Sequence, residues 1–252
     1  MDAIKKFLEE KTQCIESLEQ DSHFSALSDS WTKEACDRNY QYNFDWLGRP
    51  IIQFPGDIVA IQELIWSIKP DLIIETGIAH GGSLILSASM MALLDIESGT
   101  YEPKKRKVVG IDIDIREHNR RAIEMHPMSY LIDMIEGSSI EPSVIEQVIQ
   151  IASEHQCVLV LLDSMHTHDH VFSELNAYAP LVSKDSYCVV FDTVVEKFPK
   201  GYYPDRPWDV GNNPQSAVDC WMEGRDDFIV DASISSKLQV TSNPGGYLKR
   251  IA

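Results

Sequence analysis

Three glycines follow a short apolar run that ends in an acid, in the stretch IIETGIAHGGS at residues 73–83. Such a loop lets the backbone approach a ligand closely. It lacks the G-x-x-x-x-G-K-[ST] spacing of a triphosphate loop, because Ser83 follows the glycines without a lysine, and it lacks the second glycine of a G-x-G-x-x-G dinucleotide loop. Glu75 would also repel a pyrophosphate. The loop therefore predicts a ligand with a cationic part.

A second pair of acids follows the next apolar run, in GIDIDIR, where Asp112 and Asp114 come at its end. An acid at this place in a doubly wound sheet accepts hydrogen bonds from ribose hydroxyls. Alternation along a strand puts both side chains on one face, so the pattern leaves the choice open, and we prefer Asp112. A ligand with a ribose, an ammonium and a sulfonium is S-adenosylmethionine. The alternative is that Glu75 caps a helix and the aspartates are solvated loop acids.

Two further apolar runs also end in acids. LLDSMHTHDHV contains Asp163 and His166, and VVFDT contains Asp192. Neighbouring parallel strands would bring Asp163 and Asp192 to one edge of the sheet, where hard oxygen ligands suit Mg²⁺. An imidazole near neutral pKa at that edge can take a proton from a hydroxyl, so His166 is the candidate base.

Three histidines within five residues, at positions 166, 168 and 170, invite a rival interpretation as a transition-metal site. The hydrolase signature H-x-H-x-D-H does not match their spacing, and no histidine follows His170 to complete a non-haem iron triad. A helix that begins near His168 would turn the three side chains onto different faces. Structural roles are therefore expected for His168 and His170.

The elements that must position these residues alternate along the chain from Asp57 onward. Short apolar runs separated by helical patterns predict parallel crossovers and a doubly wound α/β sheet covered on both faces. We expect a Rossmann-like, seven-stranded, mostly parallel sheet with an antiparallel edge strand. Strands are expected in LIIET, KVVGIDI, YLIDMIEG, CVLVLLD and SYCVVFD, with shorter ones in FIVD, LQV and GYLKRI. Residues 1–56 are expected to form an N-terminal helical and aromatic extension, and residues 57–252 the ligand-binding domain.

The composition excludes several classes of protein. The formal charge, 22 basic minus 39 acidic residues, is −17, which disfavours nucleic acid and anionic membranes as partners. No apolar run approaches the roughly 18 residues of a membrane span, and the first 20 residues lack the apolar core of a signal peptide. Five scattered cysteines without a C-x-x-C pair fit neither a disulfide framework nor a thiolate zinc site. We expect a cytoplasmic protein.

With these motifs assembled, the chain resembles the cephalosporin hydroxylase / rhamnosyl O-methyltransferase family of class I S-adenosylmethionine-dependent methyltransferases. The matching pieces extend from about Trp46 to Arg250; the most specific are ETG-x-x-HGGS and EGSS. The resemblance implies O-methyl transfer in natural-product biosynthesis or carbohydrate modification. It also implies contacts with the methyl donor from the residues that match the family's binding loops: Glu75, Gly77, Ser83, Asp112, Ser138 and Ser139.

The resemblance further implies Asp163 as a magnesium ligand and His166 as the base. An acidic pair closes the fifth strand in family members with bound magnesium, but Phe191 replaces its first member here and Asp192 alone remains. A phenyl ring cannot ligate a cation, so the metal site is weakened, completed by another acid such as Glu196, or absent.

These observations predict an S-adenosylmethionine-dependent O-methyltransferase that acts on a small hydroxylated acceptor. Residues 40–46 and the proline-rich segment 197–214 are expected to contact this acceptor. A homo-oligomer is compatible with the sequence. Two alternatives stay open: a metal-dependent hydroxylase or hydrolase built on the histidines at 166–170, and a non-catalytic ligand-binding homologue that has lost the chemistry, as Phe191 would allow.

Overall fold

The computed structural model describes residues 2–99 and 106–252. Its centre is a seven-stranded sheet with the order β5-β4-β3-β6-β7-β9-β8. The strands are β3 (Leu72–Thr76), β4 (Lys107–Asp112), β5 (Ile132–Glu136), β6 (Val158–Leu162), β7 (Tyr187–Val190), β8 (Phe228–Val230) and β9 (Tyr247–Arg250). The strand order reverses between β3 and β6, so the ends of these two strands form the crevice where doubly wound sheets bind ligands.

Burial on both faces explains the apolar strands. Every residue of β3, β6 and β7 is buried, and β3 pairs in parallel with both β4 and β6. Parallel pairing continues from β4 to β5 and from β6 to β7, whereas β9 runs antiparallel to β7 and to the edge strand β8. The expected fold class, with antiparallel pairing at one edge, is confirmed.

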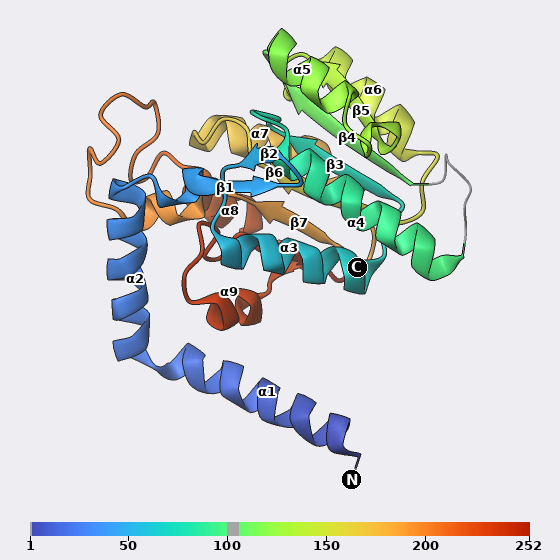
Figure 1. The fold of residues 1–252 in the computed structure, drawn as a ribbon. Helices are drawn as coiled ribbons and strands as arrows, with labels where there is room; N and C mark the ends of the chain where they lie inside the picture. The colour runs from blue at the N-terminus through green and yellow to red at the C-terminus, as the bar shows by residue number, and fades with distance from the viewer. Residues whose placement is uncertain (1, 100–105) are drawn as a thin grey trace.

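Helices cover both faces of the sheet (Figure 1). One face packs against α3 (Pro55–Ile68), α4 (Gly82–Ser98), α5 (Glu117–Glu124) and α9 (Ala232–Leu238) through a core that includes Ile61, Leu84, Ile123 and Ile234. The other face packs against α6 (Pro142–Ala152), α7 (His168–Tyr178) and α8 (Pro214–Met222). These two cores hold the carboxyl ends of β3, β4, β6 and β7 at one edge.

The N-terminal region reaches the same edge. Helix α1 (Ala3–Gln20) extends away from the sheet, α2 (Ser22–Asp37) leads back to it, and a hairpin of β1 (Phe44–Trp46) and β2 (Arg49–Ile51) lies over the start of α4 (Figure 1). Trp46 Nε1 donates to Ser89 Oγ of α4 at 3.0 Å. No helix among the described residues is both long enough and apolar enough to cross a bilayer.

Three helical parts of the fold were not specified by the sequence-based expectation. Residues 22–37, expected only as part of a helical and aromatic extension, form the helix α2. The segment LQV was expected to be a strand, but Leu238 ends α9 and Gln239 follows in a backbone conformation with φ of 61°. Helix α8 was not predicted; the side chain of Asn213 caps it by accepting from the backbone N–H groups of Gln215 and Ser216. All three helices lie outside the part of the chain in which strands and helices alternate, from β3 to β7.

Candidate functional site

Four cavities meet at the carboxyl edge of the sheet. Cavity A, about 370 Å³, lies between residues 36–54, the ends of β6 and β7, and residues 203–208. Cavity B, about 210 Å³, lies between residues 50–53 and the glycine loop 77–83. Cavity C, about 430 Å³, extends from that loop to residues 111–113 and 138–139. Cavity D, about 10 Å³, is a void behind cavity B.

Asp112 fixes the shape of the glycine loop. One carboxylate oxygen accepts from the backbone N–H groups of Ile78 (2.8 Å) and Ala79 (3.2 Å), and the other accepts from the N–H of Asp114 at 3.1 Å. Asp112 lines cavity C, whereas Asp114 is exposed and pairs with Arg116. The geometry therefore favours Asp112 over Asp114 as the acid of this cavity.

Glu75, expected from the sequence to contact the methyl donor, is almost completely buried. Its side chain is 1 % exposed, accepts from Ser83 Oγ, and lies 3.5 Å from Ser87 Oγ. It lines the small cavity D but not cavities B or C. Burial raises the pKa of Glu75 to about 7, against the opposing effect of the two serine hydroxyls. Glu75 therefore stands behind Ser83, which itself lines cavity B.

The glycines of the loop are required by the packing of the protein itself. Gly77 has φ of +88°, and a Cβ there would lie 1.9 Å from the backbone oxygen of Asp163. A Cβ on Gly82 would lie 2.2 Å from the backbone oxygen of Pro50. The first contact brings the loop against the end of β6, and the second brings residues 50–53 against the start of α4.

Asp163, His166 and Asp192 form a cluster where cavities A and B meet. Each offers a ligand atom within 4.8 Å of the others, and His166 Nε2 lies 3.2 Å from Asp192 Oδ2. The His166 ring also contacts the Trp208 ring edge to face, with 4.8 Å between their centroids. The expected approach of Asp163 and Asp192 follows from the pairing of β6 with β7.

The electrostatics of this cluster suit a divalent cation. Burial, and then the charge of Asp192, raise the pKa of Asp163 well above its ordinary range, with further contributions from Glu75, Glu174 and Asp57. A cation between the carboxylates would offset this repulsion, and carboxylate oxygens are the hard ligands that Mg²⁺ prefers. The residues present therefore fit a metal ion despite Phe191, which is 3 % exposed and belongs to the core.

Neither Glu196 nor the other two histidines join the cluster. Glu196 Oε2 accepts from the N–H of Gly211 at 2.9 Å, and from Asn213 Nδ2. His168 Nδ1 lies 3.0 Å from Ser216 Oγ, and its ring stacks on Phe172. Helix α7 begins at His168, so the three histidines diverge as expected. Among the described residues, only His166 of this trio can share a metal with two carboxylates.

His170 lies in the wall of cavity C, although a purely structural role was expected for it. Its Nε2 lies 3.1 Å from Ser139 Oγ and 3.2 Å from Ser164 Oγ, and Ser164 Oγ donates to the fully buried Glu174 at 2.7 Å. Ser138 and Ser139 of the EGSS motif line the same cavity. No sequence pattern indicates this network, because it depends on α7 packing beside the 138–139 loop.

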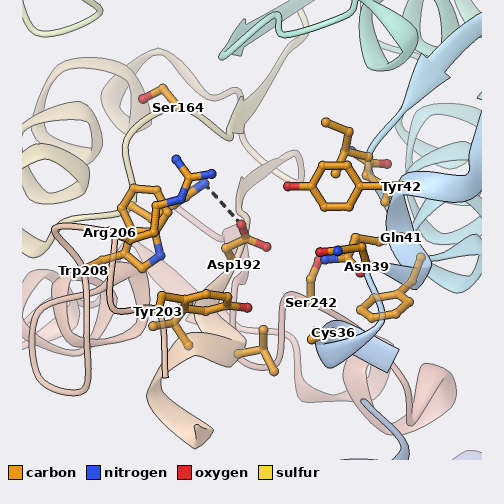
Figure 2. A pocket seen from close by; sticks show the side chains of 16 residues that line it. Cys36, Asn39, Gln41, Tyr42, Ser164, Asp192, Tyr203, Arg206, Trp208 and Ser242 are labelled. Carbon is orange, nitrogen blue, oxygen red and sulfur yellow. Dashed lines mark ion pairs between the residues drawn. The ribbon is translucent and has the colours of Figure 1, made fainter. Parts of the chain in front are cut away.

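The two segments expected to contact an acceptor do line cavity A from opposite sides. Figure 2 shows Asp192 between Gln41 and Tyr42 on one side and Tyr203, Arg206 and Trp208 on the other. Arg206 and Trp208 also line cavity C, so one segment borders both spaces. The Arg206 guanidinium lies 5.2 Å from the centre of the Trp208 ring. Cavity A is thus walled by aromatic rings and amides, together with the carboxylate of Asp192.

The buried acids make the stability of the ligand-free protein depend on pH. Burial raises the pKa of Glu75 to about 7 and that of Asp57 to about 6, so the folded state binds protons more tightly than the unfolded state. The associated stability is fully present below the ordinary carboxyl pKa and is lost as pH rises through 6 and 7. One pKa unit corresponds to about 1.4 kcal/mol. We expect the thermal midpoint to fall by several degrees between pH 5 and pH 8.

Thermal denaturation of Glu75→Gln over the same pH range provides the control for this expectation. The variant should gain stability relative to the natural protein as pH rises, because it removes one of the groups that lose their protons. Parallel pH profiles for the two proteins would contradict the assignment.

Comparison with known proteins identifies the family. The model of the family "Rhamnosyl O-methyltransferase/CmcI" matches residues 38–251. The rhamnosyl O-methyltransferase of Mycobacterium bovis (strain BCG / Pasteur 1173P2) is 28 % identical over 199 residues, covering 77 % of this chain and 73 % of that protein. That of Mycobacterium leprae (strain TN) is 26 % identical over 207 residues, covering 81 % and 82 %.

Solved structures share the fold. A CmcI structure in a Mg-SAM form has a TM-score of 0.55 at 20 % identity, covering 84 % of this chain and 78 % of that one. An apo structure of CmcI has the same TM-score at 19 % identity, covering 84 % and 77 %. Because the family model spans most of the sequence, the chain belongs to the Rhamnosyl O-methyltransferase/CmcI family of methyltransferases.

Proposed function

We propose that this protein transfers a methyl group from S-adenosylmethionine to a hydroxyl of a sugar or natural product. The family, and the mycobacterial relatives named as rhamnosyl O-methyltransferases, support this reaction class. The observation that carries the proposal is the Asp163, His166 and Asp192 cluster at the meeting point of cavities A and B. A base and two carboxylates there lie between a space for the donor and a space for the acceptor.

The donor would extend through cavities C and B. Its adenosine would occupy cavity C beside Asp112, Ser138 and Ser139, and its amino-acid end would occupy cavity B beside Gly77 and Ser83. The acceptor would enter cavity A from the other side. Methyl transfer is an in-line displacement at carbon, so holding the acceptor oxygen, the methyl group and the sulfur in line supplies much of the catalysis.

His166 would remove the proton of the acceptor hydroxyl. Its Nε2 lies 3.2 Å from Asp192 Oδ2, and the edge-to-face contact with Trp208 restricts the ring. Asp192 thereby orients the imidazole and stabilises its protonated form. Asp163 and Asp192 would hold Mg²⁺, which when bound lowers the pKa of a coordinated hydroxyl.

A cytoplasmic location and a homo-oligomeric state stay predictions from the sequence.

Calorimetric titration with S-adenosylhomocysteine, with and without Mg²⁺, tests the donor and the cation together. We expect binding to the natural protein, and a heat of Mg²⁺ binding that Asp163→Asn abolishes, because this variant removes a carboxylate from the cluster. Failure of S-adenosylhomocysteine to bind would reject the proposed donor. Equal Mg²⁺ binding by both proteins would reject the proposed metal site.

A non-catalytic homologue is the second candidate, and Phe191 is the observation that favours it. Binding of S-adenosylhomocysteine without turnover of any hydroxylated acceptor would support this candidate. The hydroxylase or hydrolase alternative loses its basis, because His168 and His170 bond elsewhere. Iron or zinc bound to the purified protein would restore it.

A further inference from the structure

Gln53 carries a polar group that the protein itself leaves without a partner. Its side chain is 5 % exposed, and its Oε1 is buried without a hydrogen-bond partner among the described residues. A buried amide oxygen without a partner costs free energy, so such atoms mark places where a ligand or water completes the hydrogen bonding. Gln53 lines cavities A, B and D, which places it beside the donor space and the reacting cluster.

We propose that Gln53 Oε1 accepts a hydrogen bond from the α-ammonium group of the methyl donor in cavity B. The inference rests on the proposed function and assigns the recognition of the donor's amino-acid end to a residue outside the glycine loop. Glu75 is poorly placed for this role, because it does not line cavity B and its carboxylate already accepts from Ser83 Oγ. Gln53 lines that cavity, and its Oε1 has no hydrogen-bond partner among the described residues.

The two walls of cavity B match the two charges of an amino acid. Gly82 and Ser83 line it at the N-terminus of α4, where backbone N–H groups and the helix dipole favour a carboxylate. Gln53 lines it from the opposite segment, which packs against the start of α4 through the Pro50 carbonyl oxygen beside Gly82. The amino-acid end of the donor would therefore place its carboxylate at the N-terminus of α4 and its ammonium group at the Gln53 amide.

Two ligands that differ only at this end test the proposal. S-adenosylhomocysteine carries the amino acid, whereas 5′-methylthioadenosine shares its adenosine and thioether but ends in a methyl group. In Gln53→Met, which keeps the side-chain length, we expect the affinity for S-adenosylhomocysteine to fall about tenfold or more, as for loss of a hydrogen bond to a charged group. The affinity for 5′-methylthioadenosine should stay within about twofold, since Gln53 does not line cavity C.

Gln41→Met is the matched control. Gln41 also has a buried, unpartnered Oε1, but it lines cavity A and not cavity B. This variant should bind both ligands as the natural protein does. Retained binding of 5′-methylthioadenosine and an unchanged thermal midpoint show that Gln53→Met is folded.

Three outcomes would overturn the inference. In the first, Gln53→Met binds S-adenosylhomocysteine normally, which means that a water molecule satisfies the amide. In the second, it weakens both ligands equally, which means that Gln53 only supports the fold of the site. In the third, the natural protein does not bind S-adenosylhomocysteine, and the proposed function then fails as well. The first two leave the proposed function intact.

Discussion

His166→Ala is expected to lower methyl transfer by about 10²- to 10⁴-fold, the usual contribution of a general base. The imidazole lies 3.2 Å from Asp192 and borders the cavities proposed for donor and acceptor. In the proposed mechanism His166 acts on the acceptor hydroxyl and binds no part of the donor, so its loss should lower turnover far more than the affinity for S-adenosylhomocysteine. Steady-state turnover and calorimetric donor affinity, measured on the same preparation, separate the two effects.

His168→Ala is the control for this variant. His168 lies two residues further along but bonds to Ser216 and stacks on Phe172, away from the cluster. Its removal should leave most of the turnover. A His166→Ala enzyme that keeps natural turnover would show that another group, or the solvent, accepts the proton. Equal losses in both variants would point to a disturbed start of α7.

Gly77→Ala is expected to disrupt donor binding and to destabilise the fold by several kcal/mol. The substitution combines a left-handed backbone, φ +88°, with a Cβ only 1.9 Å from the backbone oxygen of Asp163. These groups cannot easily move apart, because Gly77 and Asp163 both contribute main-chain atoms at the ends of central strands, β3 and β6. The loop or β6 must therefore shift, which would displace Asp163. Thermal denaturation and titration with S-adenosylhomocysteine measure the two consequences.

Gly48→Ala isolates the conformational part of this cost. Gly48 has φ of +85° but nothing within 4 Å of an added Cβ. Its substitution should cost only about 1–2 kcal/mol, the usual cost of a left-handed backbone. Should the two variants prove equally stable, the collision at Asp163 would not be a true constraint on the loop.

Much of the sheet could be predicted because strands that are buried on both faces appear in the sequence as nearly continuous apolar runs. Leu72–Thr76 is an unbroken buried strand, and the structure places it as expected. Helix α9 shows no comparable apolar pattern, because the sequence ASISSKL contributes only one buried residue, Ile234. Its helical form depends on packing against the sheet and on a cap from Asp231, whose side chain accepts from the N–H of Ser233.

The acids of the site could be predicted because parallel strands deliver their carboxyl ends to one edge. This rule brought Asp163 and Asp192 together from sequence alone, and the structure confirms their proximity. Gln53 and His170 escaped prediction because amides and histidines are common in every environment. They stand out only in the structure, where Gln53 Oε1 has no hydrogen-bond partner among the described residues and His170 lines cavity C.

The segment that contains Arg206 and Trp208 lines both cavity A and cavity C, the spaces proposed for the acceptor and for the donor's adenosine. Substitutions there would alter affinity for both substrates together, which makes the segment a poor place to retune selectivity. Asn39, Gln41 and Tyr42 line cavity A; of these only Tyr42 also lines cavity B, and none of them lines cavity C. Substitutions intended to change acceptor selectivity are therefore better placed on the N-terminal side of cavity A.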